Sequence, residues 1–245
     1  MTSISFLILT YNRCALVQRC FESLARTLQR NDVVEWLVLD NASSDDTPGY
    51  LREFMRDRPK VSCLWSARNR GVAGGRDYLL RRAHGDVLVL LDSDTEITGA
   101  EFPGNLVDAL RRPGVGVVGV GAHFVPAGWK WPFTVAAGDY EGPCDLVPGF
   151  CQAFRRGLAD SCRMDLAFNP YWLEDTDFCF QAASRGYTIW SLPRVACGVR
   201  HEWGKSGPSH SDFAWKYKYF VEKWRGKRVV AFEQKETNRC PNGCT

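Results

Sequence analysis

Hydrophobic and polar positions alternate in blocks along the first hundred residues. Short apolar runs with the length of β-strands lie at 4–9, 35–40, 61–65 and 86–91. Segments between them carry apolar residues at helical spacing, or turn residues that open a helix, at 14–29, 47–57 and 75–83. Strands that alternate with helices are typical of an open, parallel sheet. The uniformly apolar run 86–91 predicts a strand that is buried on both faces.

The second half of the chain is less regular. Its apolar runs predict strands at 115–120, 149–155 and 187–191, and its helical patterns lie at 173–185 and 212–224. Glycine, proline and aromatic residues between 121 and 148 indicate hairpins and loops. We expect a single α/β domain over 1–228, made of a nucleotide-binding half (1–100) and an irregular half (101–228), followed by a tail over 229–245.

Composition narrows the class of protein. Of 245 residues, 45% are hydrophobic and 24% are charged, and the net charge is +3. These values exclude a disordered chain, a collagen, a coiled coil and a small disulfide-knotted protein. No segment has the ~20 apolar residues that span a bilayer, and the first ten residues do not look like a signal peptide. We therefore expect a cytoplasmic protein whose ten cysteines are reduced thiols; a zinc site at Cys240 and Cys244 is the less favoured interpretation of the tail.

Two acidic residues follow the buried strand 86–91. Asp92 and Asp94 are two positions apart, so in an extended chain their carboxylates point the same way. Paired carboxylate oxygens suit Mg²⁺ or Mn²⁺, which also bind substrate phosphates. The alternative is a polar turn that merely ends the strand. The position directly after a fully apolar strand favours the metal site, because ligands bind such sheets at the carboxyl ends of the strands.

A second acidic cluster opens the predicted helix 173–185. Glu174 and Asp175 would lie in its first turn, where acids commonly complement the helix dipole. The functional alternative is that one carboxylate accepts a proton from an attacking hydroxyl. His201 follows the last predicted strand, and it is either a structural histidine or a metal ligand. The glycine-rich turn 69–76 allows a close backbone approach to phosphate, although it is neither a P-loop nor GxGxxG.

Taken in order, these segments resemble the family 2 glycosyltransferases of the GT-A fold, and most closely the rhamnosyltransferase-type branch. The resemblance covers about four-fifths of the chain, from residue 3 to 206. Each motif is weak alone, but six in the right order are specific. The matching segments are 8–13 (ILTYNR), 39–45 (LDNASSD), 69–75 (NRGVAGG), 91–94 (LDSD), 174–177 (EDTD) and His201.

The resemblance implies a role for each matching residue. Asp92 and Asp94 would hold Mn²⁺ or Mg²⁺, and His201 would complete the metal site. Asp175 would be the catalytic base, with Glu174 as its near neighbour. The acceptor side would include Gly149, Phe150 and Trp172. The nucleotide-sugar would contact residues from four of the motifs: Thr10, Tyr11, Asn12, Arg13, Asp40, Asn41, Asn69, Gly74, Arg76, Asp92 and Ser93.

The activity implied by the resemblance is a metal-dependent, inverting transfer of one sugar. The donor would be a nucleotide-diphosphate sugar, with UDP-sugars and dTDP-rhamnose both compatible. The acceptor would be a hydroxyl of a glycan, a lipid-linked glycan or a modified nucleic acid. The rival interpretations are a nucleotidyltransferase and a catalytically inactive nucleotide-sugar-binding scaffold. Intact Asp92, Asp94 and Asp175 argue against a scaffold, and the loop 10–13 lacks the glycine-rich, lysine-bearing signature of nucleotidyltransferases.

The segment 216–228 interleaves basic and aromatic residues. Phe213, Tyr217, Phe220 and Trp224 are three and four positions apart, which predicts a helix that packs them on the core and leaves its lysines in water. The functional alternative is peripheral contact with an anionic membrane or with a polyanionic acceptor.

Overall fold

The computed structural model describes residues 2–125, 135–137, 139–202, 214–225 and 227. Phe213 and the predicted tail with Cys240 and Cys244 lie outside these residues. Among the described helices, none has both the length and the apolar character needed to cross a bilayer.

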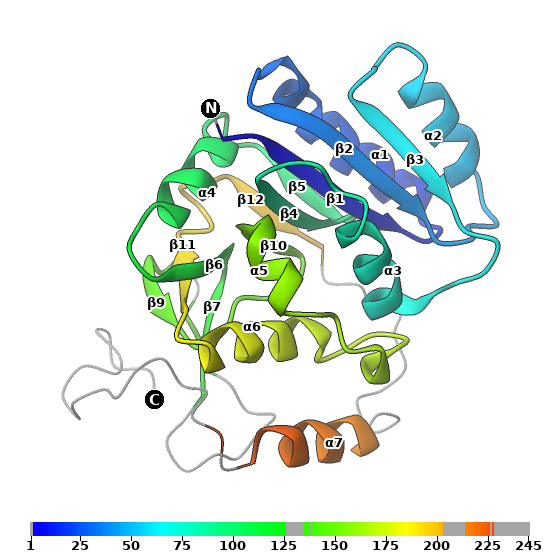
Figure 1. Cartoon of the computed structure of the whole chain (residues 1–245). Coiled ribbons are helices and arrows are strands. Elements are labelled where there is room, and N and C mark those ends of the chain that lie inside the picture. The colour runs from blue at the N-terminus through cyan, green and yellow to red at the C-terminus, as the bar shows by residue number, and fades with distance from the viewer. Residues whose placement is uncertain (1, 126–134, 138, 203–213, 226, 228–245) are drawn as a thin grey trace.

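An eight-stranded, mostly parallel sheet forms the centre of the molecule, as the strand and helix pattern predicted (Figure 1). Its order is β3-β2-β1-β4-β10-β6-β11-β9, so both halves of the chain contribute four strands. The strands are β1 Ile4–Thr10, β2 Val33–Asp40, β3 Val61–Trp65, β4 Val87–Asp92, β6 Val115–Val120, β9 Gly142–Cys144, β10 Cys151–Arg155 and β11 Thr188–Leu192.

Strand β10 runs antiparallel to both of its neighbours, β4 and β6. Its first residue, Cys151, is paired with Leu91 near the end of β4. The loop before β10 therefore meets the carboxyl end of β4, where the amide of Asp92 donates to the carbonyl of Phe150 at 3.0 Å. This reversed strand brings the 149–150 segment to the acidic end of β4.

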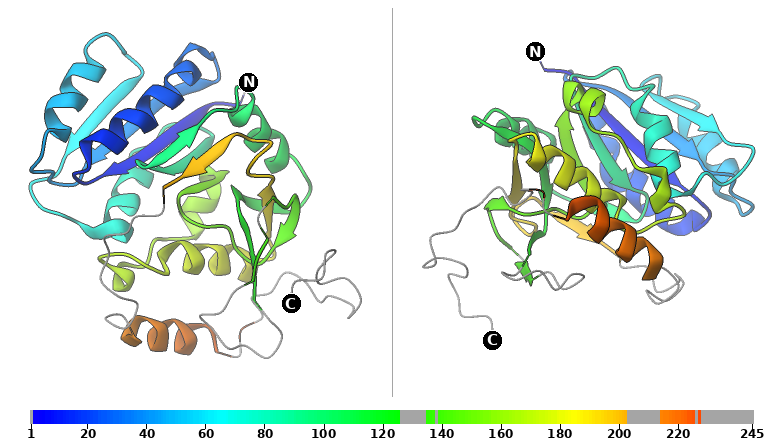
Figure 2. Two further views of the ribbon diagram at one scale, coloured as in Figure 1. Left: turned by 180° about the vertical axis from the view of Figure 1, so that it is seen from behind. Right: turned by 60° about the horizontal axis from the view of Figure 1, so that its bottom comes forward.

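Helices cover both faces of the sheet (Figures 1 and 2). Side chains alternate along each central strand, so Phe6 packs in one core and Leu7 in the other. Helices α1, α2 and α4 cover the first core, and α3, α5, α6 and α7 cover the second. The helices are α1 Cys14–Leu24, η1 Ala25–Gln29 (3-10), α2 Thr47–Met55, α3 Gly71–Leu80, α4 Phe102–Leu110, α5 Arg156–Ser161, η2 Leu166–Phe168 (3-10), α6 Glu174–Ser184 and α7 Ala214–Trp224.

Some elements differ from the prediction in their bounds or were not predicted. The helix expected from residue 75 begins at Gly71, because the side-chain oxygens of Asn41 and Asn69 accept the amides of Arg70 and Gly71 at 2.8 Å each. The helix expected over 14–29 tightens into a 3-10 turn after Leu24. The hydrophobic pattern did not predict α4, whose first turn contains proline.

Two small antiparallel sheets complete the fold: β5 (Thr95–Ile97) with β12 (Val199–His201), and β7 (Ala122–Phe124) with β8 (Val135–Ala137). In the first, His201 is paired with Thr95, which directly follows Asp94. The β12 strand thus carries a histidine from late in the sequence back to the end of β4.

Helix α7 corrects one expectation about the C-terminal segment. Phe220 and Trp224 are buried in the second core, as predicted, but Lys216 does not face water. Its side chain is fully buried, and its ammonium group donates to the carbonyls of Phe168 at 2.7 Å and Tyr171 at 2.6 Å. The backbone carbonyl groups of Phe168 and Tyr171 attract a cation that the helical spacing alone assigned to solvent.

The contacts of Lys216 predict a stability effect. Lys216→Met should lower the free energy of unfolding by about 1–3 kcal/mol, because two buried carbonyls lose their donor. Lys218→Met, on the exposed side of the same helix, is the matched control and should change it by less than about 0.5 kcal/mol. Urea denaturation of both variants measures the difference, and equal midpoints would contradict the prediction.

Candidate functional site

A cavity of about 400 Å³ opens at the carboxyl ends of β1, β2 and β4. Polar side chains come to it from the ends of three strands and from the turn before α3, which is the arrangement expected for an open parallel sheet. Of the residues predicted for donor or metal binding, those that line the cavity are Tyr11, Arg13, Asn41, Asn69, Asp92, Ser93 and Asp94.

The turn after β1 is held in a left-handed conformation. Asn12 and Arg13 have φ angles of 56° and 63°. The amide of Asn12 donates to the hydroxyl of Ser43 at 2.7 Å, and its side-chain oxygen accepts the amide of Ser44 at 2.8 Å. Asn12 therefore holds the loop after β1 against the loop after β2, and its neighbours Tyr11 and Arg13 line the cavity.

A pair of asparagines joins the loops that follow β2 and β3. The side-chain amide of Asn41 donates to the side-chain oxygen of Asn69 at 2.9 Å. These two side chains also cap the start of α3. Gly74 faces away from the cavity, because its amide donates to the side-chain oxygen of Asn169 at 3.1 Å. Gly74 thus ties α3 to the segment before α6.

Two predicted residues at strand ends are buried behind the cavity. Asp40 and Thr10 are 4% and 1% exposed. Within the described residues, neither the Oδ1 atom of Asp40 nor the hydroxyl of Thr10 has a hydrogen-bond partner. An unpaired buried acceptor costs free energy unless a bound group satisfies it. These two atoms are consistent with a ligand that supplies N–H or O–H donors.

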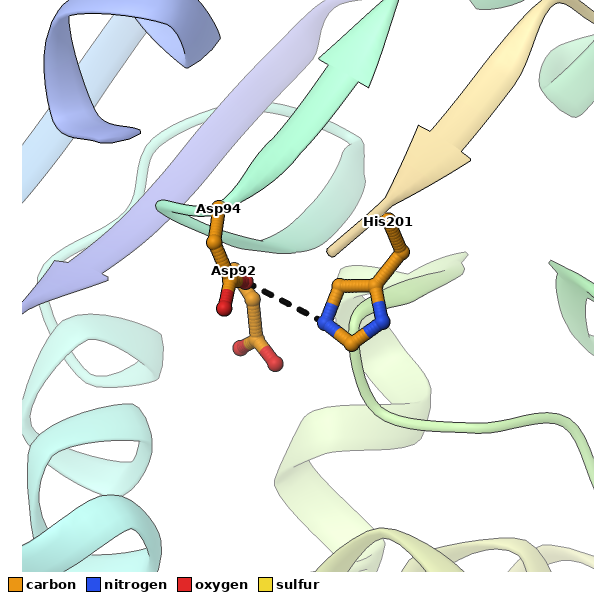
Figure 3. Close-up of side chains that lie close together, drawn as sticks. All are labelled: Asp92, Asp94 and His201. Atoms are coloured by element: carbon orange, nitrogen blue, oxygen red, sulfur yellow. Dashed lines mark ion pairs between the residues drawn. The ribbon is translucent and has the colours of Figure 1, made fainter. Parts of the chain in front are cut away.

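Three candidate metal ligands converge at the end of β4 (Figure 3). One ligand atom each from Asp92, Asp94 and His201 lies within 4.8 Å of the other two. His201 Nε2 is 3.2 Å from Asp94 Oδ1, and Arg13 Nη1 is 3.2 Å from Asp94 Oδ2. The ring of Phe150 stacks on His201 with centroids 4.4 Å apart and fixes the imidazole plane.

A buried arginine connects this cluster to the second acidic motif. Arg76 is 3% exposed, and its guanidinium is 2.6 Å from Asp92 and 3.0 Å from Glu174. It also donates to the carbonyl of Gly149 at 2.8 Å. Burial and the charge of Asp175 raise the pKa of Glu174 above its usual range, against the opposing charge of Arg76. Arg76 does not line the cavity but lies beneath it.

Asp175 is more accessible than Glu174, although they are adjacent. Its Oδ2 accepts the amide of Gly149 at 2.7 Å, and its Oδ1 accepts the amide of Thr176 at 2.7 Å. The left-handed residues Trp172 and Leu173 lead into α6 and turn this carboxylate toward the 149–150 loop. These contacts hold Asp175 at the edge of the site, whereas Glu174 forms a buried ion pair with Arg76.

The residues predicted on the acceptor side contact different parts of the protein. Gly149 and Phe150 contact the acidic groups described above, and Trp172 packs, partly buried, against the second core. Pro170 and Tyr171 line the 400 Å³ cavity and were not predicted. They belong to an irregular segment with no motif, and Lys216 holds Tyr171 in place, so no local pattern could have identified them.

Comparison with known proteins identifies the family of the chain. The family model "Glycosyl transferase family 2" matches residues 5–142, more than half of the chain. An uncharacterized glycosyltransferase of Bacillus subtilis, YfnE, is 38% identical over 79 residues, which are 31% of this chain and 20% of that protein. This chain therefore spans only a fraction of that relative.

Two solved structures share the fold. The mannosyltransferase PcManGT from Pyrobaculum calidifontis, in complex with GDP-Man and Mn²⁺, has a TM-score of 0.65 and 20% identity over 93% of this chain and 66% of its own. GalNAc-T7, with UDP, GalNAc and Mn²⁺, has a TM-score of 0.75 and 15% identity over 91% of this chain and 49% of its own. The GT-A fold, the acidic end of β4 and the match over 5–142 lead to one conclusion: the chain belongs to glycosyl transferase family 2.

Proposed function

We propose that this protein is a metal-dependent glycosyltransferase that moves one sugar from a nucleotide-diphosphate sugar to an acceptor hydroxyl. The observation that carries the proposal is the convergence of Asp92, Asp94 and His201 beside a 400 Å³ cavity at the carboxyl edge of the sheet. The proposed catalytic unit is 1–228, with 1–100 as the donor half and 101–228 as the acceptor half.

The proposed metal ligands are Asp92, Asp94 and His201, which bind the ion directly or through water. Two carboxylates and an imidazole fit Mn²⁺, whereas Mg²⁺ prefers oxygen ligands alone. The Mn²⁺ bound by PcManGT and by GalNAc-T7 supports the same choice. When bound, such an ion neutralises the charge that develops on the departing diphosphate.

The proposed nucleotide site uses the buried acceptors behind the cavity. Asp40 would accept an N–H of the base, because its Oδ1 is buried and lacks a partner among the described residues. Thr10 would bond the nucleoside, and Tyr11, with about half of its side chain exposed, would pack on it. Arg13, Asn41, Asn69 and Ser93 would line the path of the diphosphate and sugar. UDP-sugars, dTDP-rhamnose and GDP-mannose are the donors to test.

The proposed base is Asp175. Its Oδ2, oriented by the amide of Gly149, would accept the proton of the acceptor hydroxyl as that oxygen attacks C1 of the sugar. A single displacement of this kind inverts the anomeric configuration. Glu174 would act through Arg76 as a positioning residue. The acceptor would approach past Phe150 and Trp172, and a glycan, a lipid-linked glycan or a modified nucleic acid would each present a suitable hydroxyl.

Metal removal should abolish donor binding. We expect Mn²⁺ to promote binding of one nucleotide sugar in calorimetric titrations, and EDTA to eliminate it. Asp94→Asn should weaken that binding at least about tenfold, because it loses one anionic ligand and about 1.4 kcal/mol or more of interaction. The exposed Asp108→Asn is the control. Equal binding with and without metal would contradict the metal site, and binding to none of the donors would favour an inactive scaffold.

Asp175→Asn should separate donor binding from transfer. The variant keeps one of the two side-chain oxygens that accept the amides of Gly149 and Thr176, but it cannot take a proton. We therefore expect unchanged donor affinity and a loss of about 10²–10⁴ in turnover. Until the acceptor is identified, turnover can be measured as hydrolysis of the donor, with the released nucleotide diphosphate as the readout. Turnover equal to that of the unmodified protein would exclude Asp175 as the base.

A further inference from the structure

A second polar surface lies on the other side of Asn69 and Asn169 from the 400 Å³ cavity, which we call the donor cavity after its proposed ligand. Two shallow cavities of about 380 and 420 Å³ flank the segment 163–168, which contains the η2 turn. The first is lined by Arg68, Arg70 and Arg81. The second is lined by Arg163, Arg185, Lys223 and Lys227. We call these seven cations the basic face.

The charge of the basic face is largely uncompensated. Of the described residues that line the two cavities, the acids are Asp77 and Asp165. Asp77 is paired with Arg81 at 2.7 Å, and Asp165 with Lys223 at 2.7 Å. Five cations are left without an acidic partner in these cavities, on a protein whose net charge is only +3. Two neighbouring cavities on this side of the molecule therefore carry an excess of positive side chains.

Exposed apolar side chains rise between and beside the two cavities. Leu166 is 56% exposed, Trp215 is 54% exposed and Tyr219 is 36% exposed. Tyr219 is joined to the η2 segment by a hydrogen bond from its hydroxyl to Asp165 at 2.8 Å, and Trp215 is one helical turn away on the same side of α7. Figure 2 shows α7 (orange) next to α6 (yellow-green) and far from α2 (light blue). We call these three residues the apolar ridge.

We propose that the basic face and the apolar ridge together form a docking surface for an anionic lipid bilayer. Lysine and arginine side chains are attracted to the negative potential of anionic lipids, and aromatic and leucine side chains insert at the boundary between headgroups and acyl chains. A soluble polyanion would use the cations but gains nothing from an exposed leucine between them. The combination therefore favours a membrane over a nucleic acid.

The position of this surface has a consequence for the donor cavity. Asn69 lines both the donor cavity and the first basic cavity, so the two share a wall. Docking through the basic face would hold the donor cavity close to the membrane surface, where an acceptor linked to a lipid would be found. The docking proposal itself does not depend on the proposed enzymatic activity, because it rests on charge and exposure alone.

Vesicle sedimentation tests the proposal with the whole chain. We expect the protein to bind vesicles of phosphatidylcholine with 30% phosphatidylglycerol, to bind pure phosphatidylcholine far more weakly, and to dissociate as salt is raised. Arg68→Gln/Arg163→Gln should lower the partition coefficient by about tenfold or more. The matched control is Arg56→Gln/Arg111→Gln, which removes the same charge from exposed arginines directly after α2 and α4 and should bind like the unmodified protein.

A second variant separates a bilayer from a soluble polyanion. Leu166→Ser/Trp215→Ser keeps every charge and should lower vesicle binding several-fold while leaving the weak binding of polyphosphate or single-stranded DNA unchanged. Three results would overturn the proposal: no preference for anionic vesicles, equal losses in the basic-face variant and its control, or tight binding of polyphosphate or DNA with no binding of vesicles. The last result would assign the surface to a soluble polyanion.

Discussion

The site depends on the ion pairs that the buried guanidinium of Arg76 forms with Asp92 and Glu174. Asp92 and Glu174 are 82 positions apart in the sequence, and without a cation between them their charges would oppose the approach of the start of α6 to the end of β4. Arg76 pairs with both and also bonds the carbonyl of Gly149, so one side chain joins the end of β4, the start of α6 and the loop before β10. Because Arg76 and Glu174 are both buried, removal of the arginine would leave the charge of Glu174 uncompensated in the interior.

This connection explains how the two halves of the chain make one site. The family model covers 5–142, which contains β1 to β4, Asp92 and Asp94. The third candidate ligand, His201, and the proposed base, Asp175, both come later in the chain. Antiparallel β10, the small β5–β12 sheet and the first turn of α6 bring them to the carboxyl edge of the sheet. The repeated strand–helix pattern thus supplies most of the residues that line the 400 Å³ cavity, and an irregular segment adds Pro170 and Tyr171.

Helix α7 stabilises those irregular segments from outside. Lys216 binds the carbonyls of the 168–171 loop, and Trp224 donates to Asp177 in the first turn of α6 at 2.8 Å. Its inner face thereby supports the loop that supplies Tyr171 to the 400 Å³ cavity. Its outer face carries Trp215 and Tyr219 of the apolar ridge. The same short helix thus supports the loop at the site and forms part of the surface that is proposed to bind a bilayer.

The sequence alone determined the class of fold and the acidic end of β4. Apolar periodicity and the motifs at 39–45, 69–75 and 91–94 are local, so they predict strands, turns and the strand ends where ligands bind. The bridge made by Arg76, the burial of Lys216, and the contribution of Pro170 and Tyr171 depend on residues far apart in the chain. Only the tertiary structure decided them, because burial and long-range pairing determine whether a charged side chain faces solvent, neutralises a neighbour or lines a cavity.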